Sequence, residues 1–309
     1  MGMLLEGAAN GLKRLKWSHP PKNIYVAKKD YDPQVLQATK LFIGHLKESY
    51  RSRVFVEDYQ HRLLGKDTEP FNGSEPIDLV VTMGGDGTIL KAVSQFRDGL
   101  VPPVLSFSMG TLGFLLPFDF NEAKTAFHQV FTGQSLVRNR ARLRVKLPTD
   151  NHIICAMNDL TIHRGSSPHL AHMDIKVNGD LVTTAIADGV TLATPTGSTA
   201  YSLSAGGAIV HPDVPCILLT PICPQSLSFR PLIFPASSQI TIRAGPHSRG
   251  PNEISVDGFD LGQLRAKQEV TIDLNPNNGV WCVSREQDDW VRNINGLLGF
   301  NSKFGKDHP

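Results

Sequence analysis

The chain has few cysteines, and none of them is arranged as a metal site or a disulfide framework. Its 309 residues include no C-x-x-C pair. The histidines at positions 163, 169 and 172 match no zinc spacing either, so we expect no metal site built by the protein. The cysteines lie in apolar or strand-like contexts, which favours buried thiols in a reducing compartment: Cys155, Cys216, Cys223 and Cys282.

Long apolar runs and a strong charge imbalance are also missing. The best candidate for a membrane span, Cys216–Cys223, is short and contains Pro221. The formal net charge is +2, and the body of the chain has no dense basic stripe, so we expect no nucleic-acid partner. A hydrophobic content of 40% with 19% charged residues is typical of a soluble globular protein.

Three common catalytic or nucleotide-binding motifs are absent. No G-x-x-x-x-G-K-[ST] occurs, which excludes a Walker-type phosphate loop. No G-x-G-x-x-G occurs, which argues against a Rossmann dehydrogenase. The absence of G-x-S-x-G argues against an α/β-hydrolase.

A glycine turn with an aspartate at its centre is the most informative segment present. Gly84-Gly85-Asp86-Gly87-Thr88 follows the apolar run 78–83 and precedes a helical pattern from Ile89 to Phe96. Glycines allow positive φ and close approach of the backbone, and a helix N-terminus favours phosphate. Asp86 could accept a proton from a substrate hydroxyl or help to hold Mg²⁺. It could equally stabilise the turn or the helix start.

The first half of the chain alternates strand-like and helix-like segments. This alternation predicts an open parallel sheet whose ligands bind beyond the carboxyl ends of the strands. A second glycine turn, 108–114, follows another strand, so we expect the two turns to form two walls of one cleft. The predicted strands are 23–27, 54–56, 78–83 and 104–107. The predicted helices begin at Pro33 and at about Glu122, the latter with Asn121 as its cap.

The pattern changes near Arg140 to short alternating strands with turns such as Asn178-Gly179 and Asp257-Gly258. We predict a second, all-β, sandwich-like domain and a C-terminal helix over 287–298 that packs back on the first domain. The predicted organisation is a basic arm over 1–22, an α/β domain over 23–139 completed by 285–304, and a β-rich dinucleotide-binding domain over 140–284. Examples of its strands are 143–147, 174–177, 239–242 and 269–272.

The second domain holds the densest polar cluster, over 194–207, with Asn158-Asp159 as a further polar pair. Seven hydroxyl side chains and three glycines suit ribose and amide groups, and Tyr201 offers a face for a flat base. Read alone, the cluster also fits a surface loop rich in turn-forming residues, and Asn158-Asp159 also fits a turn.

The N-terminus is basic, with Glu6 as the only acid before residue 30. It resembles the end of a mitochondrial presequence, although its shortage of arginine and serine fits an ordinary basic arm better.

Taken together, Gly84–Thr88, Asn158-Asp159 and the stretch from Asp188 through Thr194–Tyr201 resemble the NAD kinase family. The glycine-aspartate turn alone is shared with phosphofructokinases and lipid kinases, whereas the threonine-serine-tyrosine stretch is highly specific. The resemblance covers about 23–304 and is stronger to the mitochondrial NADH kinases of the family, through segments at 157–159, 163–165, 167–170, 221–231 and 297–302.

The resemblance implies transfer of the ATP γ-phosphate, with Mg²⁺, to the 2′-hydroxyl of the adenosine ribose of NADH or NAD. Asp86 would be the general base. Arg164 and the amides after Gly110 would contact ATP. The residues that would bind or line the dinucleotide are Gly85, Gly87, Phe114, Asn158, Asp159, Asp188, Thr196, Thr199, Ala200, Tyr201, Ser204 and Asp257. Many relatives have glutamate at the Asp159 position.

The resemblance also implies a homodimer or larger assembly in the mitochondrial matrix, with a cytoplasmic location as the alternative. Two other functions remain open. One is a sugar or lipid kinase that shares only the glycine-aspartate turn, against which the threonine-serine-tyrosine stretch argues. The other is an inactive NADP(H)-binding regulator, against which the intact Asp86 argues.

Overall fold

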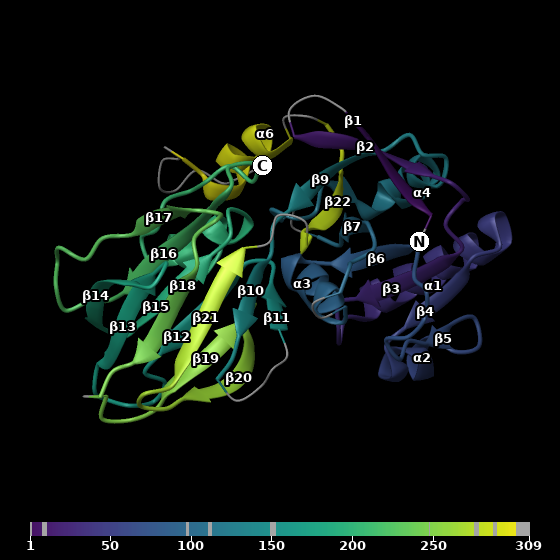
Figure 1. Cartoon of the computed structure of the whole chain (residues 1–309). Coiled ribbons are helices and arrows are strands. Elements are labelled where there is room, and N and C mark those ends of the chain that lie inside the picture. Colours follow the sequence, from purple (N-terminus) through teal and green to yellow (C-terminus); the bar gives the residue numbers. More distant parts are fainter. Residues whose placement is uncertain are drawn as a thin grey trace. The chain divides into compact units, whose positions relative to one another are not determined.

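The computed structural model describes residues 2–7, 11–96, 99–110, 113–148, 153–246, 248–274, 278–286 and 289–300 (Figure 1). The chain divides into two compact units. Unit 1 comprises 1–92, 102–139 and 281–309, and unit 2 comprises 93–101 and 140–280. No helix among the described residues is long and apolar enough to cross a membrane.

Unit 1 is built on a mixed sheet whose centre is parallel. Strands β3, β4, β6 and β7 pair in parallel, as the alternating pattern predicts, and β8 pairs with β7. Among the described residues the strand order is β1 (Met3–Gly7), β2 (Leu12–Trp17), β9 (Leu136–Arg140), β22 (Val280–Ser284), β7 (Val104–Ser108), β6 (Leu79–Gly84), β3 (Asn23–Lys28), β4 (Arg53–Val56) and β5 (Glu69–Pro70), with β8 at Phe118–Asp119.

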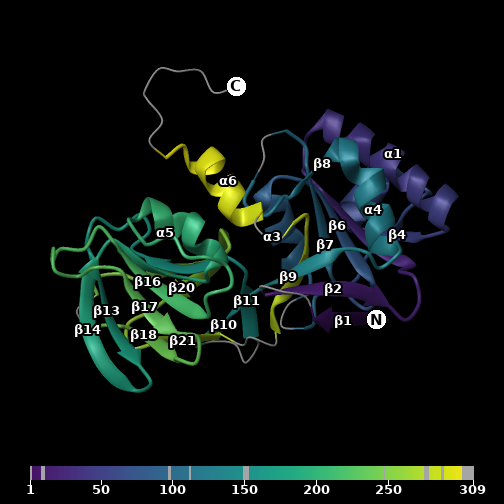
Figure 2. The same ribbon diagram turned by 90° about the horizontal axis from the view of Figure 1, so that it is seen from above.

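Two helices of unit 1, α1 (Pro33–Tyr50) and α4 (Ala123–Phe131), lie side by side (Figure 2). Phe42 of α1 packs edge-to-face against Phe127 of α4, with ring centroids 5.9 Å apart, and both join the core formed with β3, β6 and β7. Asp32 caps α1 by accepting N–H groups of Gln34 and Val35. The remaining helices are α2 (Asp58–Leu64), α3 (Asp86–Ser94) and α6 (Asp289–Leu298), the last grouping with unit 1.

The predicted cap of α4 is wrong. A single 3-10 turn, Phe120–Glu122, precedes the helix, and Asp119 rather than Asn121 caps that turn. The side chain of Asp119 accepts the N–H of Asn121 at 2.8 Å, and Glu122 reaches back to the N–H of Asp119 at 3.2 Å. This reciprocal pair is a capping box, which the sequence signal of Asp followed three residues later by Glu could have identified.

The segment predicted as a basic arm is instead part of the sheet. Strands β1 and β2 pair with each other, and β2 pairs with β9. Leu12 and Leu15 are buried, whereas Lys13 and Arg14 between them are exposed, so the strand has buried apolar positions that the charge count concealed. Trp17 Nε1 donates to the carbonyl of Val130 at 2.7 Å.

Unit 2 is a sandwich of two sheets. In the described chain these sheets are β11-β10-β21-β18-β13-β14 and β17-β16-β15-β12-β19-β20, all paired antiparallel. Their inner side chains form one core, which contains residues of both sheets. The strands are β10 (Leu143–Lys146), β11 (Ile153–Ala156), β12 (Asp159–His163), β13 (Ala171–Val177), β14 (Asp180–Ala187), β15 (Gly189–Ala193), β16 (Cys216–Ile222), β17 (Leu232–Pro235), β18 (Ile240–Ala244), β19 (Asn252–Val256), β20 (Phe259–Leu264) and β21 (Glu269–Leu274).

Two further details of unit 2 differ from expectation. Cys223 is exposed at φ 45°, so it is not the buried thiol that its apolar context predicted. The segment Val93–Val101 groups with unit 2, where Arg142 Nη2 donates to the carbonyl of Gly99 at 2.8 Å. Arg142 is fully buried and its Nε also donates to the carbonyl of Asn278 at 2.8 Å.

Candidate functional site

The two glycine turns of unit 1 begin side by side. Gly84 ends β6 and Ser108 ends β7, and these residues are partners in the parallel register. The N–H of Met109 reaches the carbonyl of Gly84 at 3.3 Å. The carboxyl ends of neighbouring parallel strands therefore bring the starts of the two turns together, and the cleft between them stays a prediction. Residues 111–112 of the second turn lie outside the described chain.

Asp86 joins the two turns. It is the first residue of α3 and is half-buried. Its carboxylate accepts the N–H of Phe114 at 3.1 Å and the N–H of Leu115 at 3.1 Å. Amide donors fix the direction of a carboxylate, so Asp86 is held in place by the second turn as well as by its own helix.

The glycines at positions 85 and 87 contribute by leaving space rather than by positive φ. Gly85 and Gly87 have no positive φ, and a Cβ added to either would meet no atom within 4 Å. A Cβ on Gly84 would lie 2.3 Å from Thr88 Oγ1, and one on Gly113 would lie 2.3 Å from Asp86 Oδ1. Gly84 and Gly113 thus permit the fold of the turns, whereas the space beside Gly85 and Gly87 stays open.

In unit 2 the polar pair Asn158-Asp159 lies where three segments meet. Thr194 donates its N–H to the carbonyl of Asn158 at 2.9 Å and its hydroxyl to the carbonyl of Met157 at 2.6 Å. Gly197 passes so close that an added Cβ would lie 2.1 Å from the carbonyl oxygen of Asn158. The start of the threonine-serine-tyrosine stretch is therefore fixed against the polar pair.

Asp257 holds the same pair from the other side. It occupies the β19–β20 turn at φ 48°, and its carboxylate accepts three backbone N–H groups, those of Met157 at 2.8 Å, Asn158 at 2.7 Å and Asp159 at 3.1 Å. Its own N–H donates to the carbonyl of Asp159 at 2.9 Å. No sequence pattern assigned this contact, because the partners are about a hundred residues apart.

Asp159 itself is 8% exposed, and its carboxyl receives the backbone N–H of Tyr201. Burial, followed by the nearby charge of Asp257, raises the pKa of Asp159 to about 7. Burial likewise raises the pKa of Asp257, although its three amide donors and Arg142 oppose that change. Asp159 is consequently a group that titrates near neutral pH.

The remaining predicted residues of the stretch differ in exposure. Thr196 is buried, Thr199 and Ala200 are half-buried, and Tyr201 and Ser204 are exposed on the short helix α5 (Tyr201–Ser204), which follows the 3-10 turn Thr196–Thr199. The exposed ring of Tyr201 is free to stack on a base.

Arg164 and Asp188 form an ion pair in unit 2. Arg164 Nε lies 2.6 Å from Asp188 Oδ1, its N–H bonds to the carbonyl of Asp188 at 2.9 Å, and its guanidinium also contacts the carbonyl of Ser167. The resemblance implies ATP for Arg164 and nicotinamide for Asp188. Because the two side chains bind each other, their geometry does not support the idea that each binds a different ligand.

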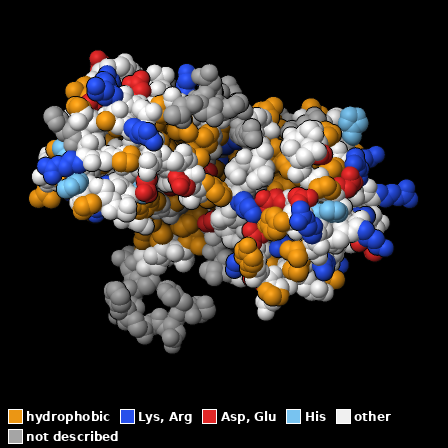
Figure 3. Space-filling view, turned by 90° about the horizontal axis from the view of Figure 1, so that it is seen from below, with side chains coloured by type: hydrophobic (Ala, Val, Ile, Leu, Met, Phe, Trp, Pro, Cys, Tyr) orange, Lys and Arg blue, Asp and Glu red, His pale blue; other side chains and the backbone are white. Residues whose placement is uncertain are grey.

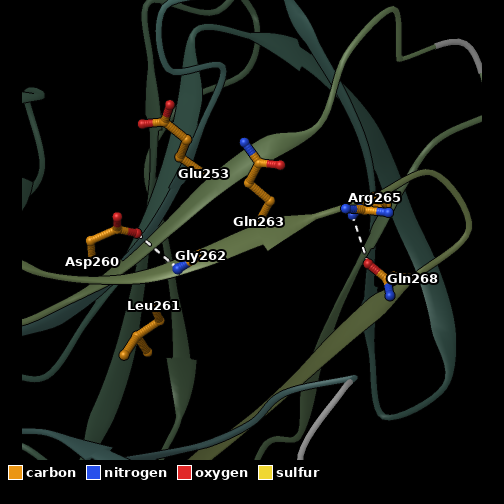
Figure 4. A pocket seen from close by; sticks show the side chains of 7 residues that line it. All are labelled: Glu253, Asp260, Leu261, Gly262, Gln263, Arg265 and Gln268. Carbon is orange, nitrogen blue, oxygen red and sulfur yellow. Dashed lines mark hydrogen bonds between the residues drawn. The ribbon is translucent and has the colours of Figure 1, made fainter.

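A hollow on unit 2 of about 590 Å³ has none of these residues in its lining (Figure 4). Its polar groups are partly used within the protein, since Asp260 accepts the N–H of Gly262 and Gln268 accepts the N–H of Arg265.

On the face in Figure 3 acidic and basic side chains are interspersed. Among the described residues, no cluster of three or more His, Cys, Asp or Glu could hold a metal ion.

The chain belongs to the NAD kinase family. The model of the ATP-NAD kinase N-terminal domain matches residues 41–135, and that of the ATP-NAD kinase C-terminal domain matches 157–281.

Its relatives include two mitochondrial NADH kinases. One is NADH kinase pos5 of Schizosaccharomyces pombe, which is 44% identical over 96% of this chain and 80% of its own length. The other is NADH kinase POS5 of Saccharomyces cerevisiae, which is 43% identical over 95% of this chain and 84% of its own length. A crystal structure of yeast NADH kinase complexed with NADH has a TM-score of 0.89 and 43% identity, covering 99% of this chain and 96% of that one.

An NAD kinase from Archaeoglobus fulgidus, solved in complex with ATP, shares the fold at a TM-score of 0.71 and 22% identity, covering 90% of this chain and 98% of that one.

Proposed function

We propose that this chain transfers the γ-phosphate of MgATP to the 2′-hydroxyl of the adenosine ribose of NADH or NAD, producing NADPH or NADP. The observation that carries the proposal is the pair of glycine turns joined through Asp86, in a chain of the NAD kinase family. A phosphate-binding turn with a fixed carboxylate suits a reaction in which a hydroxyl attacks phosphorus.

Asp86 is the proposed general base. A ribose hydroxyl is a weak nucleophile, so an oriented carboxylate accelerates the reaction by accepting its proton as the new O–P bond forms. The amides of Phe114 and Leu115 keep the carboxylate in one orientation. Mg²⁺ enters with the substrate as MgATP, where it neutralises the triphosphate and aligns the transferred group. The space beside Gly85 and Gly87 supports their assignment to the dinucleotide phosphates.

The dinucleotide-binding residues of unit 2 are proposed from the family motif and supported by local geometry. Asn158 and Asp159 would hold the adenosine ribose, since hydroxyl groups pair well with amide and carboxyl oxygens. Phe114 would lie at the adenine. The exposed residues Tyr201 and Ser204, with Asp188, would bind the nicotinamide half. Thr196, Thr199 and Ala200 would line the pocket, Asp257 would lie at its edge, and Arg164 remains the proposed ATP contact.

The direct test is to incubate the purified chain with MgATP and either NADH or NAD, and to quantify NADPH and NADP. Product from both, with NADH faster, supports an NADH-preferring kinase. Product mainly from NAD leaves the kinase and removes the preference. Dinucleotide binding without product favours the inactive regulator, and phosphorylation of a sugar or lipid instead favours the broader kinase group that shares the glycine-aspartate turn.

Location and assembly are proposed by similarity. Two relatives are named as mitochondrial, which supports a mitochondrial matrix location over a cytoplasmic one. Fractionation of cells that express the tagged natural protein tests this directly. A homodimer or larger assembly is expected from the family resemblance, and light scattering of the purified protein measures its mass.

A further inference from the structure

Both carboxylate oxygens of Asp257 accept hydrogen bonds from the segment that carries Asn158 and Asp159. Both of its oxygens accept N–H groups, Oδ2 from Met157 and Oδ1 from Asn158 and Asp159. Three bonds from successive residues to one carboxylate fix the backbone of the segment that carries Asn158 and Asp159. Asp257 is half-buried as a residue, and its carboxylate faces this backbone.

The side chains of Asn158 and Asp159 differ in the hydrogen bonds that they make within the protein. Asn158 is half-buried, and in the described part of the chain its side-chain amide makes no hydrogen bond, so the amide is available to a ligand. Asp159 receives only the N–H of Tyr201 among the described contacts of its carboxyl. The backbone is thus fixed, the amide of Asn158 remains available, and the buried carboxyl of Asp159 can accept further hydrogen bonds besides the one from Tyr201.

We propose that Asp257 is a positioning residue for dinucleotide binding, which holds Asn158 and Asp159 in their receptive conformation without touching the substrate itself. This inference rests on the proposed function and makes it more specific. Asp257 is then not a residue at the edge of the pocket, as the family resemblance implies, but one that supports the binding residues from behind.

The charge of Asp257 also affects the ionisation of Asp159. Asp257 places a negative charge near the buried carboxyl of Asp159, and the positive charge of Arg142 acts on Asp257. Arg142 is buried and donates to carbonyl groups of Gly99 and Asn278. Removing the charge of Asp257 should therefore let Asp159 ionise at lower pH, because one of the two causes that raise its pKa is gone.

The test compares Asp257→Asn with Asp260→Asn, a matched control with the same chemical change in the same hairpin. Asp260 is exposed and accepts only a local N–H, from Gly262, among the described residues. NADH affinity is measured by titrating its fluorescence from pH 5 to 9. An asparagine must turn its NH₂ group toward one of the three N–H donors, so we expect affinity to fall about 10-fold in Asp257→Asn. We also expect the pH midpoint of binding to move to lower pH, with neither change in Asp260→Asn.

Equal affinity and an equal pH profile in Asp257→Asn, Asp260→Asn and the unaltered protein would overturn the proposal. If Asp257→Asn does not fold, Asp159→Asn provides the second measurement. The neutral pH midpoint of NADH binding should vanish in that variant. Its persistence would show that Asp159 is not the titrating group on which Asp257 acts, and would overturn the proposal. These titrations need no turnover, so a chain that binds NADH without phosphorylating it would disprove the kinase and still test the role of Asp257.

Discussion

The two units fix their polar side chains in different ways. In unit 1 a side chain, Asp86, is held by backbone amides of a neighbouring turn, at the ends of two adjacent parallel strands. In unit 2 the backbone of Asn158 and Asp159 is held by another side chain, Asp257, and by Thr194, while their own side chains stay available.

The difference matches the tasks proposed for the two units. A general base must point in one direction, so its carboxylate is itself bound. A binding group must bond to the hydroxyls of a ligand, so its backbone is fixed while its side chain keeps hydrogen-bonding capacity for the ligand. Substitutions in unit 1 should therefore reduce turnover at little cost in stability. Those in unit 2 should change affinity and stability.

The largest effect is expected for Asp86→Asn. Asparagine has nearly the same shape but cannot accept the proton, and its NH₂ group must face the N–H of Phe114 or Leu115. Turnover should therefore fall by about 10²–10⁴, while NADH affinity changes less than about 3-fold. Steady-state kinetics combined with fluorescence titration measure both quantities. Near-normal turnover would show that Asp86 is not the general base, and the comparison between the two units would then fail.

Gly113→Ala should come next. The added Cβ would lie 2.3 Å from Asp86 Oδ1, and the side chain of Asp86 can move more easily than the backbone. We expect a loss of turnover of roughly 10², as for other small misplacements of a catalytic group, with a small change in melting temperature. Gly44→Ala, in the middle of α1 with no atom within 4 Å of its Cβ, is the control and should keep full activity.

Gly197→Ala tests whether a substitution in unit 2 reduces stability and affinity rather than turnover. Its Cβ would lie 2.1 Å from the carbonyl oxygen of Asn158, which is backbone and cannot turn aside. We expect the free energy of unfolding to fall by about 2–3 kcal/mol, together with weaker NADH binding. Denaturant unfolding gives the first quantity. A variant with unchanged stability but lost turnover would mean that the two units do not differ in this respect.

The last effect, expected for Asp159→Asn, depends on pH. The pKa of Asp159 is about 7 in the folded chain against an ordinary value of 3.8, so its contribution to stability is complete below about pH 4 and is lost as pH rises to 7. Asparagine carries no such penalty at high pH. We therefore expect the variant to be more stable than the parent by about 4 kcal/mol at pH 8, with the gain disappearing near pH 4. Equal stability differences at both pH values would contradict the raised pKa.

The sequence predicted the repeating parts of the fold well. The parallel strands of unit 1 and the sandwich strands of unit 2 follow from apolar runs and alternation, which depend on neighbours a few residues apart. It mistook β1 and β2 for an arm, because basic residues hid the buried Leu12 and Leu15. It also placed the α4 cap at Asn121, since a short 3-10 turn separates the true cap, Asp119, from the helix.

For the candidate site, the sequence by itself determined the residue types: a glycine turn with Asp86 after a buried strand, the polar pair, and the threonine-serine-tyrosine stretch. Only the tertiary structure decided what holds them. The amides that orient Asp86 come from a turn 28 residues away, and the carboxylate that fixes Asn158 comes from 99 residues away. Hydrogen bonds over such separations depend on how strands pair and loops meet, and no local pattern of residues encodes that.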